Sequence, residues 1–230
     1  MNAAREATRA VLDRLDWAAL GDVYFHEDGE QELRERRKAV LGCGMALAEL
    51  LLPQLPRGGA SLWVGAGLAE LPVLLAEALR GDRTVVAANL RAVECEVLNA
   101  ALAAAAPHAP LRFCAEDART AAPGQVFDHL GCVSLFTDPE SWPLLSDVAY
   151  GRIPPVLIDV ERFVAERDAA RALATALFER LRRPGLVTTT AEEVSWFLEQ
   201  ADLVGASIEA GEELVEAAIV GDPIGVLRVQ

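Results

Sequence analysis

Apolar and polar residues follow two different spacings along this chain, and the spacing changes from segment to segment. Runs of consecutive apolar residues are typical of strands buried on both faces of a sheet, whereas apolar residues at every third or fourth position are typical of helices. The predicted strands span residues 61–64, 84–88, 111–114, 130–135 and 186–189. The predicted helices span residues 2–20, 30–52, 69–79, 92–105, 160–181 and 191–200, with a short helix beginning within 138–143. This alternation predicts an α/β fold, a parallel sheet with helices on both faces.

Prolines separate the N-terminal helices from the rest of the chain. Pro53 and Pro56 end the second predicted helix, because proline lacks the backbone N–H that a helix interior requires. Residues 1–56 are therefore predicted to form an N-terminal helical extension or cap, and residues 57–230 to form the α/β domain.

The C-terminal segment has a different pattern, with short strand-like runs close together. Runs at 203–210 and 217–220 precede a last run at 224–229. The turn Gly221-Asp222-Pro223 separates the last two runs and predicts that they pair as a hairpin.

Composition is consistent with one α/β domain and a short extension. The chain has 230 residues, of which 52% are hydrophobic, enough for a substantial core. No apolar run approaches the roughly 20 residues that a membrane span needs. Arg5, Glu6 and Arg9 interrupt the order of basic and apolar residues that a signal peptide requires. We therefore expect a cytoplasmic location and no membrane partner.

The charge of the chain bears on its partners. Its formal net charge is −14, from 21 basic and 35 acidic residues, and such a surface repels phosphate backbones, so nucleic acid is not expected as a partner. One basic cluster spans residues 34–38 among glutamates at helical spacing. This pattern favours a solvated helix face with i,i+4 ion pairs over a contact for an anionic ligand.

Cysteine and histidine give no metal or disulfide motif. The four cysteines are far apart and form no C-x-x-C pair, which favours reduced thiols in the core. Residues 22–29 are predicted to form a polar loop that contains His26, Glu27 and Asp28. This group invites a metal interpretation, but its spacing matches no known cation-binding loop, so we expect an acidic solvated loop and no metal.

A glycine-containing turn follows the first predicted strand. Gly65-Ala66-Gly67 comes directly after the run that ends in Trp63 and Val64, and a helix and a second strand follow. Such a strand, glycine turn and helix are typical of nucleotide-binding α/β domains, in which the backbone must approach a ligand closely. A tight turn that serves helix packing alone is the alternative.

In this order of elements, residues 57–230 resemble the class I S-adenosylmethionine-dependent methyltransferase family. The resemblance implies a Rossmann-like seven-stranded mixed sheet whose last strand is antiparallel, and S-adenosylmethionine as the cofactor. It also implies that Gly65, Ala66 and Gly67 approach that cofactor. The chain departs from the family's first motif, because Trp63 stands where an acidic residue usually lies and Ala69 replaces the third glycine. We expect the Trp63 indole to be buried beneath the loop, in space that the methionine end of the cofactor could use.

The resemblance implies further cofactor contacts after the second and third strands. Asn89 stands where the family has an acid that holds the two ribose hydroxyls, and Leu90 would line the adenine site. Asn89 as a cap of the next helix is the alternative. Glu116, Asp117 and Ala118 resemble the family's third motif, in which the acid accepts from the adenine amino group. An Asx turn at Asp117 is the alternative.

The segment after the fourth strand is the predicted substrate wall. Ligands of open α/β sheets bind outside the carboxyl ends of the strands, and Ser134, Phe136 and Asp138 lie in that segment. Asp138 as a helix cap is the alternative. The sequence identifies no general base.

Two hypotheses of function follow. In the first, the chain is a methyltransferase that uses S-adenosylmethionine and acts on a small or medium-sized molecule. In the second, it is a catalytically inactive methyltransferase-like scaffold that binds a partner or a nucleotide-like ligand, because Trp63, Ala69 and Asn89 depart from the motifs. Aminopropyl transfer on the same fold is disfavoured, because paired acids for a polyamine are not evident. The oligomeric state stays open, with a homodimer among the alternatives.

Overall fold

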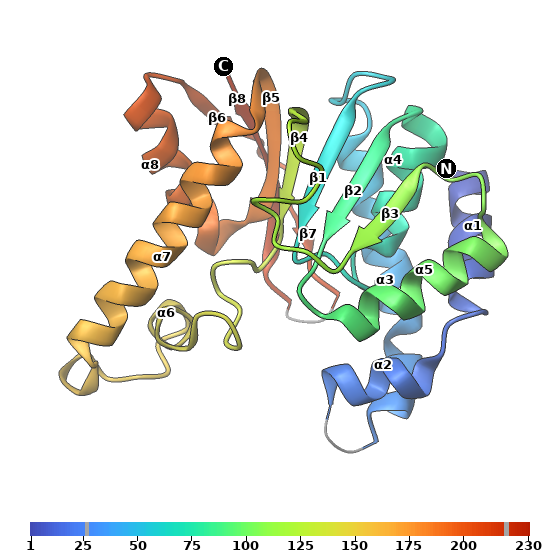
Figure 1. The fold of residues 1–230 in the computed structure, drawn as a ribbon, viewed down its shortest axis with the longest axis horizontal. Coiled ribbons are helices and arrows are strands. Elements are labelled where there is room, and N and C mark those ends of the chain that lie inside the picture. Colours follow the sequence, from blue (N-terminus) through green and yellow to red (C-terminus); the bar gives the residue numbers. More distant parts are fainter. Residues whose placement is uncertain (26–27, 219–220) are drawn as a thin grey trace.

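Eight strands form one mixed sheet in a computed structural model that describes residues 1–25, 28–218 and 221–230. The strand order is β3-β2-β1-β4-β5-β8-β6, with the short β7 paired to β8 (Figure 1). The strands are β1 (Ala60–Val64), β2 (Thr84–Ala88), β3 (Leu111–Cys114), β4 (Phe127–Cys132), β5 (Leu181–Thr190), β6 (Ile208–Ala210), β7 (Val215–Glu216) and β8 (Pro223–Val229). The strands β1, β2, β3, β4 and β5 pair with their neighbours among one another in parallel. β8 is antiparallel to β5, β6 and β7.

Helices cover both faces of the sheet (Figure 1). The α-helices are α1 (Asn2–Leu12), α2 (Trp17–Tyr24), α3 (Gly29–Leu51), α4 (Leu71–Gly81), α5 (Ala92–Ala105), α6 (Pro143–Ala149), α7 (Val160–Glu179) and α8 (Val194–Val204). The described residues also form two 3-10 helices, η1 (Pro155–Leu157) and η2 (Ala191–Glu193). Apolar residues of α1, α3, α4 and α5 form the core on one face, and those of α7 and α8 form the core on the other.

The structure confirms the predicted fold class. β2, β3 and α5 have the predicted bounds, and the C-terminal strand is antiparallel to its neighbour β5. The predicted C-terminal hairpin exists as β7 paired with β8, although its first strand is residues 215–216. Of the run predicted at 217–220, residues 219 and 220 lie outside the described residues. No helix in the described part of the chain is long and apolar enough to cross a membrane.

The N-terminal prediction needs a correction, because the predicted helix over residues 2–20 is two helices. Asp16 has extended backbone angles, and its side chain accepts a hydrogen bond from the Ala19 backbone N–H at 3.1 Å. An aspartate in this position starts a new helix. The new helix, α2, then continues through Gly21 to Tyr24, into the predicted polar loop. His26 and Glu27 of that loop lie outside the described residues.

The fourth and fifth strands both begin earlier than predicted. β4 begins at Phe127, and its second and third residues, Asp128 and His129, are buried. Polar residues obscure a buried strand in the sequence pattern, and here their side chains have buried partners. β5 begins at Leu181 and crosses Pro184 with a register shift against β4.

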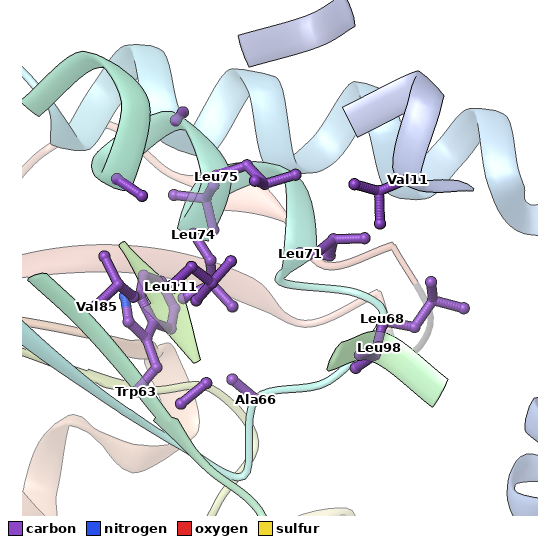
Figure 2. Packing of buried hydrophobic residues seen from close by; sticks show 14 of the residues in the cluster. Val11, Trp63, Ala66, Leu68, Leu71, Leu74, Leu75, Val85, Leu98 and Leu111 are labelled. Atoms are coloured by element: carbon purple, nitrogen blue, oxygen red, sulfur yellow. The ribbon is translucent and has the colours of Figure 1, made fainter. Parts of the chain in front are cut away.

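Trp63 is completely buried, as predicted, and it lies in the core between the sheet and α4. Figure 2 shows its indole beside Val85 and Leu111, with Leu74 of α4 nearby. Its Nε1 donates to a carboxylate oxygen of Glu77 on α4 at 2.8 Å. The indole is therefore fixed by the helix that covers this face of the sheet.

The carboxylate of Glu77 belongs to a buried polar network at the amino ends of the strands. The Arg83 guanidinium is fully buried, forms an ion pair with Asp128, and has its Nε 3.4 Å from Glu77 Oε2. Ser61 Oγ donates to the same Glu77 oxygen. Burial raises the pKa of Glu77, but the neighbouring His129, Ser61 and Arg83 outweigh it, and the pKa lies below its ordinary value.

Candidate functional site

A cavity of about 760 Å³ lies at the edge of the sheet where the parallel strands end. Its walls come from the segments that follow β1, β2, β3 and β4, from α2 and α3 on one side, and from α7 and the residues that flank α6 on the other. Figure 1 shows α2 and α6 on opposite sides of this edge. Open α/β sheets bind ligands at this edge, and the volume falls within the range of small-molecule sites.

The cavity brings together most of the residues that the sequence nominated. Those that line it are Gly65, Asn89, Leu90, Glu116, Asp117, Ala118, Ser134 and Asp138. Ala66, Gly67 and Phe136 do not line it. Trp63 does not line it either.

The glycine turn is held by carboxylates of the protein itself. Gly65 has a φ of +71°, a left-handed conformation that favours glycine. The Gly67 N–H donates to Glu70 at 2.9 Å, and the Leu68 N–H donates to Glu94 at 2.9 Å. A Cβ on Gly67 would lie 2.0 Å from Glu94 Oε1. Glycine at this position thus leaves room for the Glu94 carboxylate.

Asn89 lies at the end of β2 with both polar atoms of its side chain engaged. Its Nδ2 donates to the Ala66 carbonyl and to Glu94 Oε2, both at 3.1 Å. Its Oδ1 accepts from the Arg91 N–H at 2.9 Å, an Asx turn that leads into α5. Leu90, the next residue, is exposed at the cavity.

Asp117 also forms a turn, and its carboxylate accepts hydrogen bonds from an arginine. Its Oδ1 accepts from the Arg119 N–H at 2.8 Å, and the Arg119 Nε lies 3.0 Å from both carboxylate oxygens. The hydrogen bonds from Arg119 hold the pKa of Asp117 below its usual value. The adjacent Ala118 is buried, and its carbonyl accepts from Arg180.

The segment after β4 presents two of the three predicted substrate-wall residues. Ser134 has a φ of +51°, and its buried Oγ has no hydrogen-bond partner among the described residues. Asp138 accepts from Ser141 Oγ at 2.7 Å, within a turn that precedes α6. Phe136 is buried and stacks on Trp196, with 5.1 Å between ring centroids, in the core under α8.

Glu193, a residue that sequence reasoning missed, holds this segment in place. Its Oε1 accepts from the Phe136 N–H at 2.6 Å, and from the backbone N–H and hydroxyl of Thr137 at 3.0 and 3.1 Å. Burial of the carboxyl raises the pKa of Glu193 to about 7. The sequence carried no sign of this role, because Glu193 is far from the segment along the chain.

Three more missed residues, Tyr24, Glu70 and Glu94, gather at the end of the cavity under the N-terminal cap. The Tyr24 hydroxyl donates to Glu94, which is fully buried. Glu70 is partly buried and lines the cavity, and burial raises its pKa to about 7. Glu94 follows Asn89 by five residues, which is the one local signal that could have linked it to the site.

Acidic residues pair with two of the arginines around the cavity. The Arg91 guanidinium lies 2.9 Å from Glu140, Arg119 pairs with Asp117, and Arg152 lies over the Tyr150 ring at 4.6 Å. In the basic cluster on α3, Arg34–Glu30 and Arg36–Glu32 are the predicted i,i+4 ion pairs, whereas Arg37 pairs with Asp13 at the end of α1. The described part of the site therefore offers no concentrated positive charge.

Comparisons with known proteins identify the fold. No protein-family model and no curated protein matches the sequence. Among solved structures, the chain is similar to the 16S rRNA methylase RmtB (17% identity, TM-score 0.51, 100% of this chain and 75% of that one). It is also similar to a methyltransferase from Pyrococcus furiosus (13% identity, TM-score 0.52, 81% and 82%) and to NSun6 from Pyrococcus horikoshii with SFG (14% identity, TM-score 0.53, 81% and 51%).

These similarities define the class of fold. The chain has the class I S-adenosylmethionine-dependent methyltransferase fold, with the predicted antiparallel last strand. At 13–17% identity the likeness concerns the fold alone. The chain spans 48% of another similar structure, TrmN from Thermus thermophilus, and 51% of NSun6.

Proposed function

We propose that this protein is a methyltransferase that binds S-adenosylmethionine and transfers its methyl group to a small or medium-sized molecule. The observation that carries the proposal is the cavity of about 760 Å³ at the carboxyl ends of β1, β2 and β4. Gly65 of the glycine turn and the residues after β2 and β3 line this cavity, which extends to the segment after β4. This extent leaves room for a second molecule beside the cofactor.

The residues present are compatible with an adenosine group. Leu90 offers an exposed apolar surface to a base. Asp117 offers carboxylate lone pairs beyond those that Arg119 uses, and Asn89 Oδ1 keeps a second lone pair for a ribose hydroxyl. At the other end of the cavity, Glu70 offers a carboxylate to the ammonium group of the methionine part. Glu70 would take the role of the acid that Trp63 replaces in the sequence motif.

The protein's contribution to the reaction is proximity and orientation. When bound, S-adenosylmethionine supplies a methyl group on a positively charged sulfur, which is already activated for transfer. The walls after β1 and β4 then hold the two reactants against each other and exclude water, which lowers the entropic part of the barrier. The Ser134 hydroxyl, buried without a partner among the described residues, is the group we assign to contact with the substrate.

Charge supports a small or medium-sized substrate rather than RNA. One similar structure, that of the 16S rRNA methylase RmtB, is of an RNA-modifying protein by name. RNA binding depends on unneutralised basic side chains that release counterions from phosphates. Here the chain carries a net charge of −14, and the arginines Arg91 and Arg119 at the cavity pair with acids.

Titration calorimetry with S-adenosylmethionine and S-adenosylhomocysteine tests the proposal. We expect micromolar dissociation constants for both, and Asp117→Ala weakens binding by about 10- to 100-fold because a hydrogen bond to a charged group is lost. Asp202→Ala removes an exposed aspartate on α8 and serves as the matched control. Transfer of a labelled methyl group to a small-molecule extract, and not to total RNA, would establish the substrate class.

An inactive scaffold is the second candidate, and a specific observation favours it. The polar atoms of Asn89 and the carboxylate of Asp117 already have partners within the protein. If neither ligand gives heat at millimolar concentration, the methyltransferase proposal fails and the scaffold takes its place.

A further inference from the structure

Glu94 lies outside the cavity yet touches three of the segments that build it. Its carboxylate is fully buried in the first turn of α5. It accepts hydrogen bonds from the Tyr24 hydroxyl of α2, from the Leu68 N–H of the glycine turn, and from Asn89 Nδ2 at the end of β2. One side chain therefore joins the N-terminal cap, the glycine turn and the second strand.

The donors are divided between the two oxygens of the Glu94 carboxylate. Oε1 accepts from Tyr24 and Leu68, and Oε2 accepts from Asn89. Gly67 leaves the space that this arrangement needs, because a Cβ there would lie 2.0 Å from Oε1. An ionised carboxylate is acceptor-only and so can meet three donors at once, which an amide cannot do.

The Tyr24 hydroxyl stays a donor under ordinary conditions. Burial raises the pKa of Tyr24 well above its ordinary value, and the charge of Glu94 and the hydrogen bond to it raise it further. The Tyr24 ring also lines the cavity and has the Arg91 guanidinium over it at 5.4 Å. The cap thus contributes both a wall of the cavity and a hydrogen bond to the residue beneath the glycine turn.

We propose that Glu94 is a positioning residue, which fixes the glycine turn in its ligand-ready conformation and makes that conformation depend on the N-terminal cap through Tyr24. Its role as a determinant of cofactor affinity rests on the proposed function. Glu94 does not line the cavity, so it would act through Leu68, Asn89 and Tyr24.

Exchange of donors and acceptors between positions 89 and 94 distinguishes positioning from simple packing. In Glu94→Gln, an amide N–H₂ faces either Asn89 Nδ2 or the Leu68 N–H, so two donors oppose each other. In Asn89→Asp, two buried carboxylates oppose each other, and the Ala66 carbonyl loses its donor. The double variant again pairs a donor with an acceptor between the two positions, so its defect is smaller than the sum of the single defects.

This structure also changes what we expect of Asn89→Asp by itself. From the family motif, an acid at this position would strengthen the contact with the ribose hydroxyls. Because Asn89 Nδ2 lies 3.1 Å from Glu94 Oε2, the new carboxylate would instead oppose a buried one. We therefore expect weaker cofactor binding.

The experiment measures S-adenosylmethionine affinity by calorimetry and amide hydrogen exchange of the glycine turn, in the full chain. We expect Glu94→Gln to weaken binding by at least 10-fold and Tyr24→Phe by about 3-fold, and both to speed exchange in residues 65–70. Exchange in β5 and β8 should stay unchanged. The matched control is Glu96→Gln, an exposed carboxylate on the same helix.

The outcomes separate this inference from the proposed function. If the unaltered protein does not bind S-adenosylmethionine, the proposed function fails, but the exchange measurement needs no ligand and still decides whether Glu94 fixes the turn. If Glu94→Gln exchanges like the unaltered protein in residues 65–70, or binds within twofold of it, Glu94 is not a positioning residue. Equal acceleration of exchange throughout the sheet would indicate general destabilisation and overturn the inference as well.

Discussion

The Arg91 guanidinium lies 2.9 Å from the Glu140 carboxylate and joins two segments on either side of the cavity. Arg91 follows β2, and Glu140 follows β4. Both residues line the cavity, and the Glu140 side chain is 66% exposed. This ion pair therefore connects the segment that we assign to the cofactor with the segment that we assign to the substrate.

High salt is expected to weaken the ion pair between Arg91 and Glu140. An exposed ion pair contributes about 1 kcal/mol at most, and salt screens it, with a Debye length of about 10 Å at 0.1 M and 3 Å at 1 M. We expect high salt to speed dissociation of S-adenosylmethionine from the unaltered protein, and to do so much less in Glu140→Gln. Stopped-flow measurements at both salt concentrations test this. The same salt dependence in both proteins would rule out the ion pair as the cause.

The buried Glu193 predicts how stability depends on pH. Its pKa is about 7 in the folded protein and 4.5 for an ordinary glutamate, so between these values the folded state holds the proton more tightly than the unfolded state. The free energy of unfolding therefore falls as pH rises from about 4.5 to 7, by about 3 kcal/mol from this group. Above pH 7 the carboxyl is ionised in both states, and its contribution is constant.

Urea unfolding at pH 5 and pH 8 measures this dependence. In Glu193→Gln, the difference in unfolding free energy between the two pH values should shrink by about 3 kcal/mol. Glu192→Gln, an exposed neighbour, should leave the difference unchanged. An unchanged difference in Glu193→Gln would mean that its carboxyl titrates normally in the folded protein.

The sequence predicts the fold well where apolar residues are consecutive. β2 is a short, mostly apolar run between turn residues, and the structure gives it the predicted bounds. β3 also has the predicted bounds, although the exposed Arg112 interrupts its apolar residues. β4 begins three residues before the predicted start, because Asp128 and His129 are polar and nonetheless buried. Their partners Arg83 and Glu77 come from distant parts of the chain, so no local pattern could indicate them.

The sequence predicted the location of several residues of the candidate site but not their contacts. Strand ends and glycine turns are local features, and they located Gly65, Asn89, Asp117 and Ser134 at the cavity. What the side chains do there depends on contacts between distant segments. Glu94 contacts Tyr24, which lies 70 positions away in the chain. No local pattern in the sequence indicates that these two residues are close in space.

The left-handed backbone conformation of Ser134 predicts that a glycine variant is more stable than an alanine variant. Its φ of +51° is left-handed, which costs a residue with a Cβ roughly 1 kcal/mol relative to glycine. We therefore expect Ser134→Gly to be more stable than Ser134→Ala by roughly 1 kcal/mol, as measured by thermal or urea unfolding. If Ser134 contacts the substrate, both variants lose turnover while S-adenosylmethionine affinity stays the same. Equal stability of the two variants would show that the left-handed conformation carries no cost here.

Arg83 is the cation of the buried polar network that also includes Glu77 and Asp128. Its guanidinium is fully buried between Glu77 and Asp128. Removing one partner of a buried ion pair leaves the other charge without compensation, at a cost of about 3–5 kcal/mol. We expect Arg83→Ala to lose that much unfolding free energy in urea, whereas Arg80→Ala, an exposed arginine on α4, should change it by less than about 0.5 kcal/mol.

The loss in Arg83→Ala should also depend on pH in a definite direction. Arg83 is one of the groups that lower the pKa of Glu77, so removing the guanidinium raises this pKa from its value in the unaltered protein. The folded variant then binds more protons at acidic pH than the unaltered folded protein does, so the loss of stability becomes smaller as pH falls. The loss relative to the unaltered protein should therefore be smaller at pH 5 than at pH 8. A loss of equal size at both values would mean that the energy of Arg83 lies in its packing and its bond to the Pro56 carbonyl, and not in its charge.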